Sequence, residues 1–296
     1  MLAPILVFAY NRPDHLKQTI ASLLKNPLAK SSVLYAFSDG AKTDFEIEKI
    51  NEVRDYLRKV SGFADIILEF SEENKGLAKS VIEGVSKVIN LHDKVIVLED
   101  DLLVSADFLT FMNNALDFYQ NEEKVGSVSG YSFLLENCED AREINAVHRI
   151  SSWGWGTWKD RWELVDWELK DFEAFKNNKF QVDAFKNGGN DLWPMIQKQN
   201  KGLINSWAIR WTYSHFTNQM VCMVPKYSKV KNIGTDGSGT NFKSNTEEYL
   251  TKAVEAEISF SKDIKADPKV SAYIRNTFKT SIFRRLFNFL KFGIRS

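Results

Sequence analysis

The sequence predicts an α/β fold built on a mostly parallel, doubly wound sheet, and three features of its first 130 residues support this. Short apolar runs of strand length alternate with longer segments whose apolar residues recur at helical spacing. The runs are apolar throughout, as in strands that are buried on both faces. Four such strand-then-helix units follow one another, which favours a parallel sheet covered by helices.

The elements are expected in the following order. Pro4 to Tyr10 forms the first strand, and Pro13 opens a helix at a position where the missing N–H of proline costs nothing. Thr43 and Glu46 have the spacing of a capping box at the start of the second helix. The other expected elements are strands over 33–37, 64–70, 94–98 and 125–129, and helices that begin after Gly76 and near Asp107.

From about residue 131 the pattern loosens. Trp155, Trp158 and Trp162 are spaced as on one face of a helix, so we expect a Trp-rich helical stretch there. Two helices are expected over 192–199 and 207–217, a strand over 221–225, and a Gly-rich mobile loop over 233–241. The chain is thus expected in three parts: 1–130, 131–267 with the mobile loop, and the tail 268–296.

Composition excludes some classes of protein. The 296 residues carry 39 basic and 39 acidic side chains, so no overall positive field would attract nucleic acid. Cys138 and Cys222 are too few for a disulfide framework, and no signal peptide or bilayer-spanning run is recognisable. We therefore expect a cytoplasmic setting.

Polar residues stand at or just after the ends of the expected strands. They are Asn11, Asp39, Asn74 and the run Glu99-Asp100-Asp101. Because ligands of doubly wound sheets bind outside the carboxyl ends of the strands, we expect these residues to gather at one edge.

The three consecutive acids Glu99, Asp100 and Asp101 would repel one another at a sheet edge unless they had a partner. Mg²⁺ or Mn²⁺ is the simplest one, since such ions take one or two carboxylates and complete their shell with phosphate and water. The alternative is that some of these acids cap the next helix, although Asp107 fits that role better.

Asp39 could accept a hydrogen bond from the edge of a nucleobase, although an Asp-Gly turn is equally consistent with the sequence. Arg12, with Asn11, and Lys75 lie where strands turn into helices and could face a phosphate or base. The alternative for both cations is a solvated surface position. His148 and His215 are isolated, which favours structural roles.

Trp153 and Trp155 flank Gly154, which would let backbone and ligand approach closely. We therefore select these three residues as ligand-binding candidates as well.

Several of these segments resemble GT-A glycosyltransferases, most of all the N-acetylglucosaminyltransferase I type. The run from Val97 through Glu99-Asp100-Asp101 to Phe108 is similar to the family's metal-binding segment. The resemblance extends loosely over residues 4–242, and its other parts are 4–12, 38–39, 153–156 and 234–239. The chain also looks like bacterial sugar transferases of surface-polysaccharide loci.

The resemblance implies a GT-A fold and a UDP-sugar donor. Asp101 would coordinate Mn²⁺ (or Mg²⁺). Asp100 would contact the ribose, Glu99 would contact the donor sugar region, and Asp39 would hold the uracil. The expected reaction is a metal-dependent, inverting transfer to a hydroxyl of a glycan or lipid-linked glycan. Residues 1–130 would bind the donor, and residues 131–267 the acceptor.

One position departs from the family. Its catalytic base is an Asp just before a Trp at a helix start, where this chain has Asn205-Ser206-Trp207. Asp191 and Asp236 are possible substitutes. A catalytically degenerate binding or assembly protein therefore remains an alternative. A sugar-phosphate nucleotidyltransferase is less expected, because no Gly-rich basic loop lies near the N-terminus.

The tail from Pro268 to Ser296 contains three Lys, four Arg and no acid. Its apolar residues recur at helical spacing: Phe278, Ile282, Phe283, Leu286, Phe287, Phe289 and Leu290. Such a segment can lie on an anionic membrane surface, here the inner face of the plasma membrane. The alternative is a helix that packs on the domain.

Overall fold

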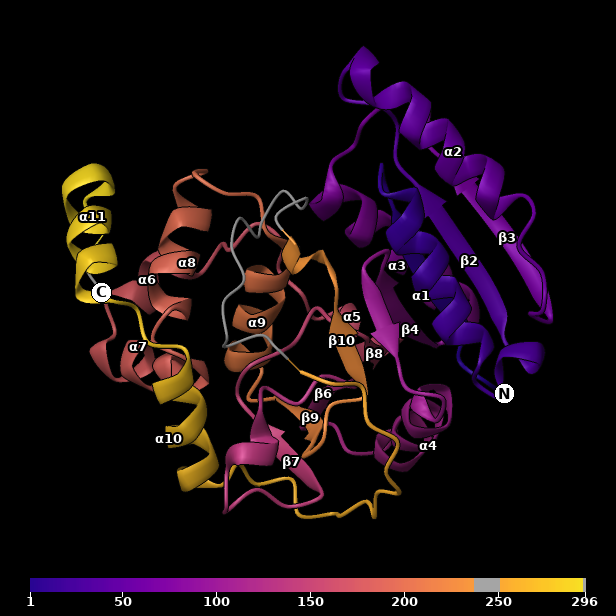
Figure 1. Ribbon diagram of the computed structural model, residues 1–296. Coiled ribbons are helices and arrows are strands. Elements are labelled where there is room, and N and C mark those ends of the chain that lie inside the picture. Colours follow the sequence, from indigo (N-terminus) through magenta and orange to yellow (C-terminus); the bar gives the residue numbers. More distant parts are fainter. Residues whose placement is uncertain (237–250, 295–296) are drawn as a thin grey trace.

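The computed structural model describes residues 1–236 and 251–294, and it confirms the predicted α/β fold (Figure 1). Eight strands form one mixed sheet: β1 (Ile5–Ala9), β2 (Val33–Ser38), β3 (Asp65–Phe70), β4 (Lys94–Glu99), β6 (Val125–Ser129), β7 (Ile144–Val147), β8 (Trp155–Trp158) and β9 (Val221–Pro225). Their order is β3-β2-β1-β4-β8-β6-β9-β7. The first four in this order are parallel, which is the predicted doubly wound half.

The helices of this half begin close to where the sequence predicts. They are α1 (Pro13–Leu24), α2 (Ile47–Leu57), α3 (Leu77–His92) and α4 (Phe108–Tyr119). The Thr43–Glu46 capping box forms, but it closes a short 3-10 turn that leads into α2. Asp107 stands at the start of α4 without capping it, because its carboxylate pairs with Lys229. Asn26 accepts the N–H of Leu109 instead, at 2.8 Å.

The Trp-rich stretch differs from the prediction. Trp155 to Trp158 form β8, which is antiparallel to both β4 and β6 in the middle of the sheet. Two residues three apart point to opposite faces of a strand. Trp155 accordingly packs against Trp211, whereas the indole of Trp158 donates to Leu116 O of α4. The apolar spacing of these Trp residues is compatible with a helix and with a strand. The segment forms a strand here, where both of its faces are buried.

The second half of the chain adds small helices around the sheet. They are α5 (Lys159–Trp162), α6 (Phe172–Lys176), α7 (Lys179–Phe185), α8 (Leu192–Asn200) and α9 (Trp207–Thr217). The predictions of α8, α9 and β9 are confirmed. Helices α6 to α9 enclose a smaller aromatic core around Phe175, Phe185 and Tyr213.

A second, two-stranded sheet joins distant parts of the chain at the end of β4. In it β5 (Leu102–Val104) pairs antiparallel with β10 (Val230–Asn232), and the 3-10 turn η5 (Gly234–Asp236) follows. The loop predicted over 233–241 lies largely outside the described residues. The pairing sets the residues after β10 beside the Glu99-Asp100-Asp101 run.

The C-terminal tail forms two helices, α10 (Pro268–Thr277) and α11 (Ile282–Phe292). The prediction of one apolar face from Phe278 onward is corrected here. Phe278 is 3% exposed and packs with α10 in the main core, with Arg149 3.9 Å from its ring. Ser281 then caps a separate helix by accepting the N–H of Arg284. In the described parts of the chain, no helix has the length and apolarity needed to cross a bilayer.

Candidate functional site

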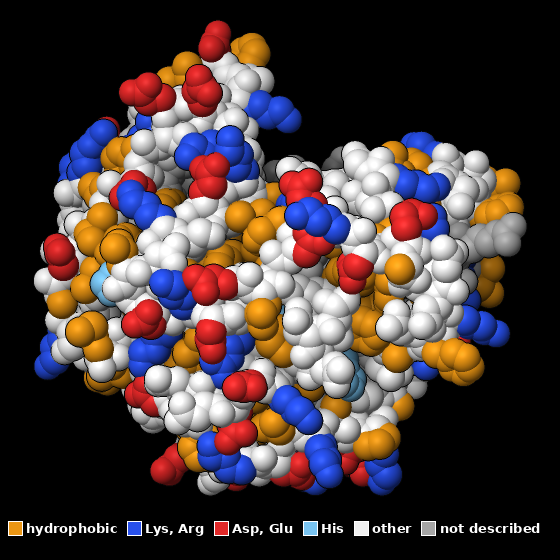
Figure 2. Space-filling model, turned by 180° about the vertical axis from the view of Figure 1, so that it is seen from behind, with side chains coloured by type: hydrophobic (Ala, Val, Ile, Leu, Met, Phe, Trp, Pro, Cys, Tyr) orange, Lys and Arg blue, Asp and Glu red, His pale blue; other side chains and the backbone are white. Residues whose placement is uncertain are grey.

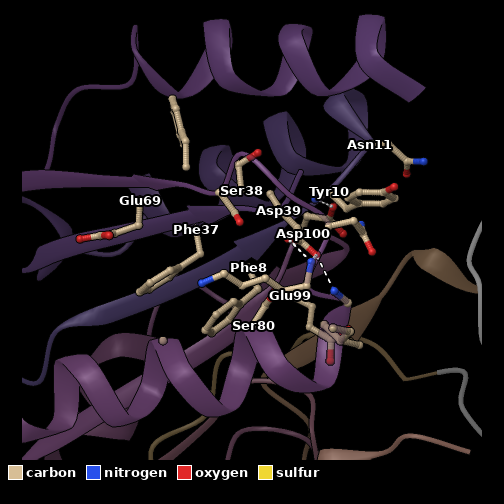
Figure 3. A pocket seen from close by; sticks show the side chains of 18 of the residues that line it. Phe8, Tyr10, Asn11, Phe37, Ser38, Asp39, Glu69, Ser80, Glu99 and Asp100 are labelled. Atoms are coloured by element: carbon tan, nitrogen blue, oxygen red, sulfur yellow. Dashed lines mark hydrogen bonds between the residues drawn. The ribbon is translucent and has the colours of Figure 1, made fainter. Parts of the chain in front are cut away.

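A pocket of about 610 Å³ opens where β1, β2 and β3 end, against the first turns of α3 (Figure 3). This is the edge at which ligands of doubly wound sheets bind. The predicted strand-end residues do gather here: Asn11, Arg12, Asp39, Asn74, Lys75, Glu99 and Asp100 all line the pocket. The prediction that these strand-end residues gather at one edge of the sheet is thus confirmed.

The floor of the pocket is aromatic. The rings of Phe8 and Phe37 stack with their centroids 4.8 Å apart and their planes 14° apart. Gly84 of α3 lies against them, and a Cβ there would be 2.8 Å from the Phe8 ring. Glycine therefore lets α3 approach the two rings closely, and both rings contribute apolar carbon to the lining of the pocket, where a planar heterocycle can pack.

Asp39 connects the end of β2 to the start of α3. Its carboxylate accepts the N–H groups of Lys75 at 2.9 Å and Gly76 at 2.8 Å. Gly76 has a φ of +74°, which favours glycine. The side chain of Lys75 turns to Glu83, 2.8 Å away. Asp39 therefore fixes the turn that forms one wall of the pocket.

Arg54 of α2, which was not predicted as a site residue, holds the ends of β2 and β3 together. Its guanidinium donates to Ser38 Oγ, Asp39 O and Ser71 O, and it lies 5.2 Å from the centre of the Phe70 ring. Burial lowers the pKa of Arg54. The sequence does contain an indication that Arg54 is partly buried, because this residue directly follows Val53 at the edge of the apolar face of α2.

A second missed group stands at the pocket mouth. Glu46 accepts from Asn11 Nδ2 at 3.1 Å, and Tyr10 Oη accepts the N–H of Lys42 at 3.0 Å. Burial, with a hydrogen bond to Glu46, raises the pKa of Tyr10 to about 12. The capping box of η2 (Asp44–Glu46) therefore also orients residues that line the pocket.

Of the acidic run, Glu99 and Asp100 line the pocket, whereas Asp101 lies next to them outside the lining. Asp100 accepts the N–H of Tyr10 at 3.2 Å and is paired with Arg12, whose Nη2 also lies 2.8 Å from Asp101 Oδ2. Burial, then the charges of Asp101 and Asp100, raise the pKa of Glu99 to about 8. Burial also raises the pKa of Asp100 to about 6 against the opposing charge of Arg12. The acids thus form a crowded cluster that a single arginine neutralises in part.

Asp101 fits a hard divalent cation. Its Oδ1 is buried and has no hydrogen-bond partner among the described residues. Within the described ranges, no three His, Cys, Asp or Glu side chains are arranged to hold a metal ion. A cation would therefore be held by Asp101, with or without a neighbouring acid, and by ligands from outside the protein, as Mg²⁺ is in many phosphate sites.

The turn η5 presses on the same carboxylate. Ile233 donates its N–H to Asp101 O at 2.9 Å. A Cβ built on Gly234 would lie 2.0 Å from Asp101 Oδ2. The close approach therefore requires glycine at position 234, two residues before Asp236 at the end of η5. The side chain of Asp236 lies outside what the structure describes.

Trp153, Gly154 and Trp155 do not line the pocket. Trp155 is 1% exposed in the aromatic core, and Trp153 packs edge-on against Tyr131. Gly154 has a φ of +61°, and a Cβ there would lie 2.7 Å from a methyl group of Val230. This glycine serves close packing between protein segments, which the sequence pattern does not distinguish from close approach to a ligand.

Asp191 does not line the pocket either. Its carboxylate receives both Nη1 and Nη2 of Arg149, each at 2.9 Å. Asn205 Oδ1 accepts from Arg210, and Ser206 caps α9 by accepting the N–H of Ile209. These residues therefore have structural partners.

Comparison with known proteins identifies the family. Residues 5–187, more than half of the chain, match the family described as "Glycosyl transferase family 2". No curated protein sequence matches the chain.

Solved structures to which the chain is similar include a TarS fragment (residues 1-349) from S. aureus, with 13% identity and a TM-score of 0.43. The match covers 78% of this chain and 60% of that one. An active-site mutant of LgtC has 10% identity and a TM-score of 0.42, and the match covers 94% of this chain and 97% of that one. A mannosyltransferase from Pyrobaculum calidifontis, solved with GDP-Man and Mn²⁺, has 12% identity, a TM-score of 0.37 and coverage of 54% and 46%. The family match and the mostly parallel sheet with its strand-end pocket agree with the predicted GT-A fold, and the chain belongs to glycosyl transferase family 2.

Proposed function

We propose that this chain transfers a sugar from a UDP-sugar to a hydroxyl group of a glycan acceptor, in a metal-dependent, inverting reaction of surface-polysaccharide synthesis. One observation supports this most: a single pocket joins the aromatic floor at Phe8 and Phe37 to the acidic run at Asp100. Its volume of about 610 Å³ is within the range of small-molecule sites. The specific likeness to the N-acetylglucosaminyltransferase I type stays a prediction.

The proposed donor position follows from the chemistry of the walls. The uracil would lie on the Phe8–Phe37 surface beside Asp39, and the diphosphate near Arg12. Asn11 and the backbone around Lys75 would border the nucleotide. Asp100 would contact the ribose, and Glu99 the donor sugar. We assign Trp153, Gly154 and Trp155 to the packing of the core and not to contact with the donor, because they are buried and do not line the pocket.

We propose Asp101 as the ligand of Mn²⁺ or Mg²⁺, through its unpartnered Oδ1. When bound, the cation neutralises the departing diphosphate. Arg12 already offsets charge at the same carboxylates and would remain next to the phosphates. Asp101 and Arg12 together would therefore receive the negative charge that develops on the leaving group.

Residues 131–267 would bind the glycan or lipid-linked acceptor, whose hydroxyl must lose a proton. Asp236 is the better supported base, because it follows Gly234, which touches Asp101. Asp191 would first have to leave its two contacts with Arg149.

The test is a thermal-shift screen of UDP-, GDP- and dTDP-sugars with and without Mn²⁺, followed by mass spectrometry for released nucleotide. We expect stabilisation by UDP-sugars that depends on Mn²⁺, and slow hydrolysis of one of them. Stabilisation by no nucleotide sugar would contradict the proposal. The start of α9 carries Asn205-Ser206 and no carboxylate, which favours the binding or assembly protein as the alternative. Tight binding of a UDP-sugar without transfer or hydrolysis would support that alternative.

A further inference from the structure

Helix α11 turns its apolar face away from the protein. Six large apolar side chains of this helix are between 49% and 86% exposed. They are Ile282, Phe283, Leu286, Phe287, Phe289 and Leu290. At 100° per residue they cover an arc of about 160°. Helix α11 lies at the edge of the molecule (Figure 1), and the view from behind shows hydrophobic side chains along that edge, which is on the right there (Figure 2).

The opposite side of α11 attaches the helix to α8. Asn288 is 1% exposed and is the buried residue of this helix. Lys201 Nζ donates to Phe292 O at 2.7 Å, and Lys198 Nζ lies 5.2 Å from the centre of the Phe292 ring. A helix that covers a domain core buries its apolar stripe. Helix α11 does the opposite: its polar side contacts the protein and its apolar side faces outward.

Cations border the exposed arc. Arg284 and Lys291 lie next to its Phe287 edge and Arg285 next to its Phe289 edge, at 100° per residue. No acid occurs from Pro268 onward. In α10, Lys269 pairs with Asp140 at 2.7 Å, whereas the three cations of α11 form no ion pair among the described residues. Their charge is available for an external partner.

We propose that α11 lies flat on an anionic lipid surface. Its apolar arc would enter the interface while the flanking cations contact the headgroups, the arrangement of interfacial amphipathic helices. Eleven helical residues extend about 16 Å, too short to span a bilayer and sufficient to lie in its surface. A second copy of the chain is a poorer occupant, because face-to-face packing would bring the two sets of cations together. This inference does not depend on the proposed transferase activity.

The experiment is co-sedimentation of the full chain with vesicles of phosphatidylcholine alone or mixed with phosphatidylglycerol. We expect binding to the anionic vesicles, weakened on the order of tenfold without phosphatidylglycerol. The double variants Phe283→Ser/Leu290→Ser and Arg284→Gln/Arg285→Gln should each reduce binding by roughly tenfold. Phe45→Ser is the matched control, since Phe45 is 97% exposed in η2 and should not affect binding.

Unchanged unfolding temperatures of these variants would exclude misfolding, because the replaced side chains are exposed. The proposal is overturned if the full chain stays in the supernatant with anionic vesicles at low salt. Equal binding by Phe283→Ser/Leu290→Ser would overturn it too. The proposal would also be overturned if the wild type does not bind lipid but forms a dimer in light scattering, and Phe283→Ser/Leu290→Ser is monomeric.

Discussion

Nη2 of Arg12 lies 2.8 Å from Oδ2 of Asp101, and the same nitrogen pairs with Oδ1 of Asp100. One positive charge therefore serves two buried carboxylates at the position proposed for a metal ion. Burial lowers the pKa of Arg12, but the two carboxylates outweigh it and the net shift is upward. A cation at the unpartnered Oδ1 of Asp101 would share this carboxylate with Arg12, so Arg12 and the metal should be energetically coupled.

Replacing Asp101 should remove the metal-dependent part of UDP binding. In Asp101→Ala, and in the isosteric Asp101→Asn, we expect the gain in UDP affinity on adding Mn²⁺ to fall by at least about tenfold. The fold should persist, because Arg12 keeps its pair with Asp100. Calorimetric titration with and without Mn²⁺ measures the gain. Wild-type coupling between UDP and Mn²⁺ in both variants would rule Asp101 out as the ligand.

Replacing Arg12 should make folding depend on the metal. Arg12→Ala leaves clustered carboxylates without their cation, which costs about 3–5 kcal/mol of unfolding free energy. Mn²⁺ should restore part of it, so the unfolding temperature should rise more with Mn²⁺ in Arg12→Ala than in the wild type.

Arg54→Ala is the matched control for this prediction. Arg54 also lines the end of the sheet, but it donates to the backbone oxygens of Asp39 and Ser71. Its loss should destabilise the protein without an added response to Mn²⁺. The same Mn²⁺ response in both variants would show that the coupling does not involve the carboxylates.

Gly234→Ala should damage the metal site through a single methyl group. The added Cβ would lie 2.0 Å from Asp101 Oδ2, so η5 or the carboxylate must move. We expect weaker Mn²⁺-dependent UDP binding by calorimetry. Gly202→Ala is the comparison, since Gly202 has a φ of +68° and no neighbour within 4 Å of the added carbon. It should lower stability only. Equal nucleotide binding by both variants would contradict a close contact between η5 and Asp101.

The parallel half of the fold was predictable because its strands are apolar runs and each helix start has a local signal, although only β1 is buried throughout and the edge strand β3 is partly exposed. Asn11, Arg12, Asp39 and Asp100 could be placed together for the same reason, since parallel strands end at one edge. Strand β8 could not be predicted, because the spacing of Trp155 and Trp158 fits a helix and a strand equally well. Its position between β4 and β6 depends on partners far along the chain.

Individual roles in the site were harder to predict than its position. An Asp-Gly pair looks the same whether the carboxylate binds a ligand or, like Asp39, fixes Lys75 and Gly76 of another segment. Gly154 likewise serves contact with Val230. The orientation of α11 was also beyond the sequence, because an amphipathic pattern does not tell which face meets the protein. Such contacts are set by tertiary packing between residues far apart in sequence.

His215 should remain neutral well below the usual range of histidine. Its Nδ1 lies 3.1 Å from Trp211 O, so Nδ1 carries the proton and Nε2 accepts from Ser127 Oγ at 2.9 Å. Burial lowers the pKa of His215 to about 4, whereas an unfolded histidine titrates near 6.5. Above pH 6.5 both states are neutral and this residue contributes no pH dependence. As the pH falls from 6.5 toward 4, the unfolded chain takes up a proton that the folded protein does not, so stability falls by up to about 3 kcal/mol. Imidazole NMR signals, assigned with His215→Gln, should show His215 neutral down to about pH 5, and the variant should lose less stability than the wild type between pH 7 and 5. Titration of the His215 signal near pH 6.5 would contradict its burial between Ser127 and Trp211.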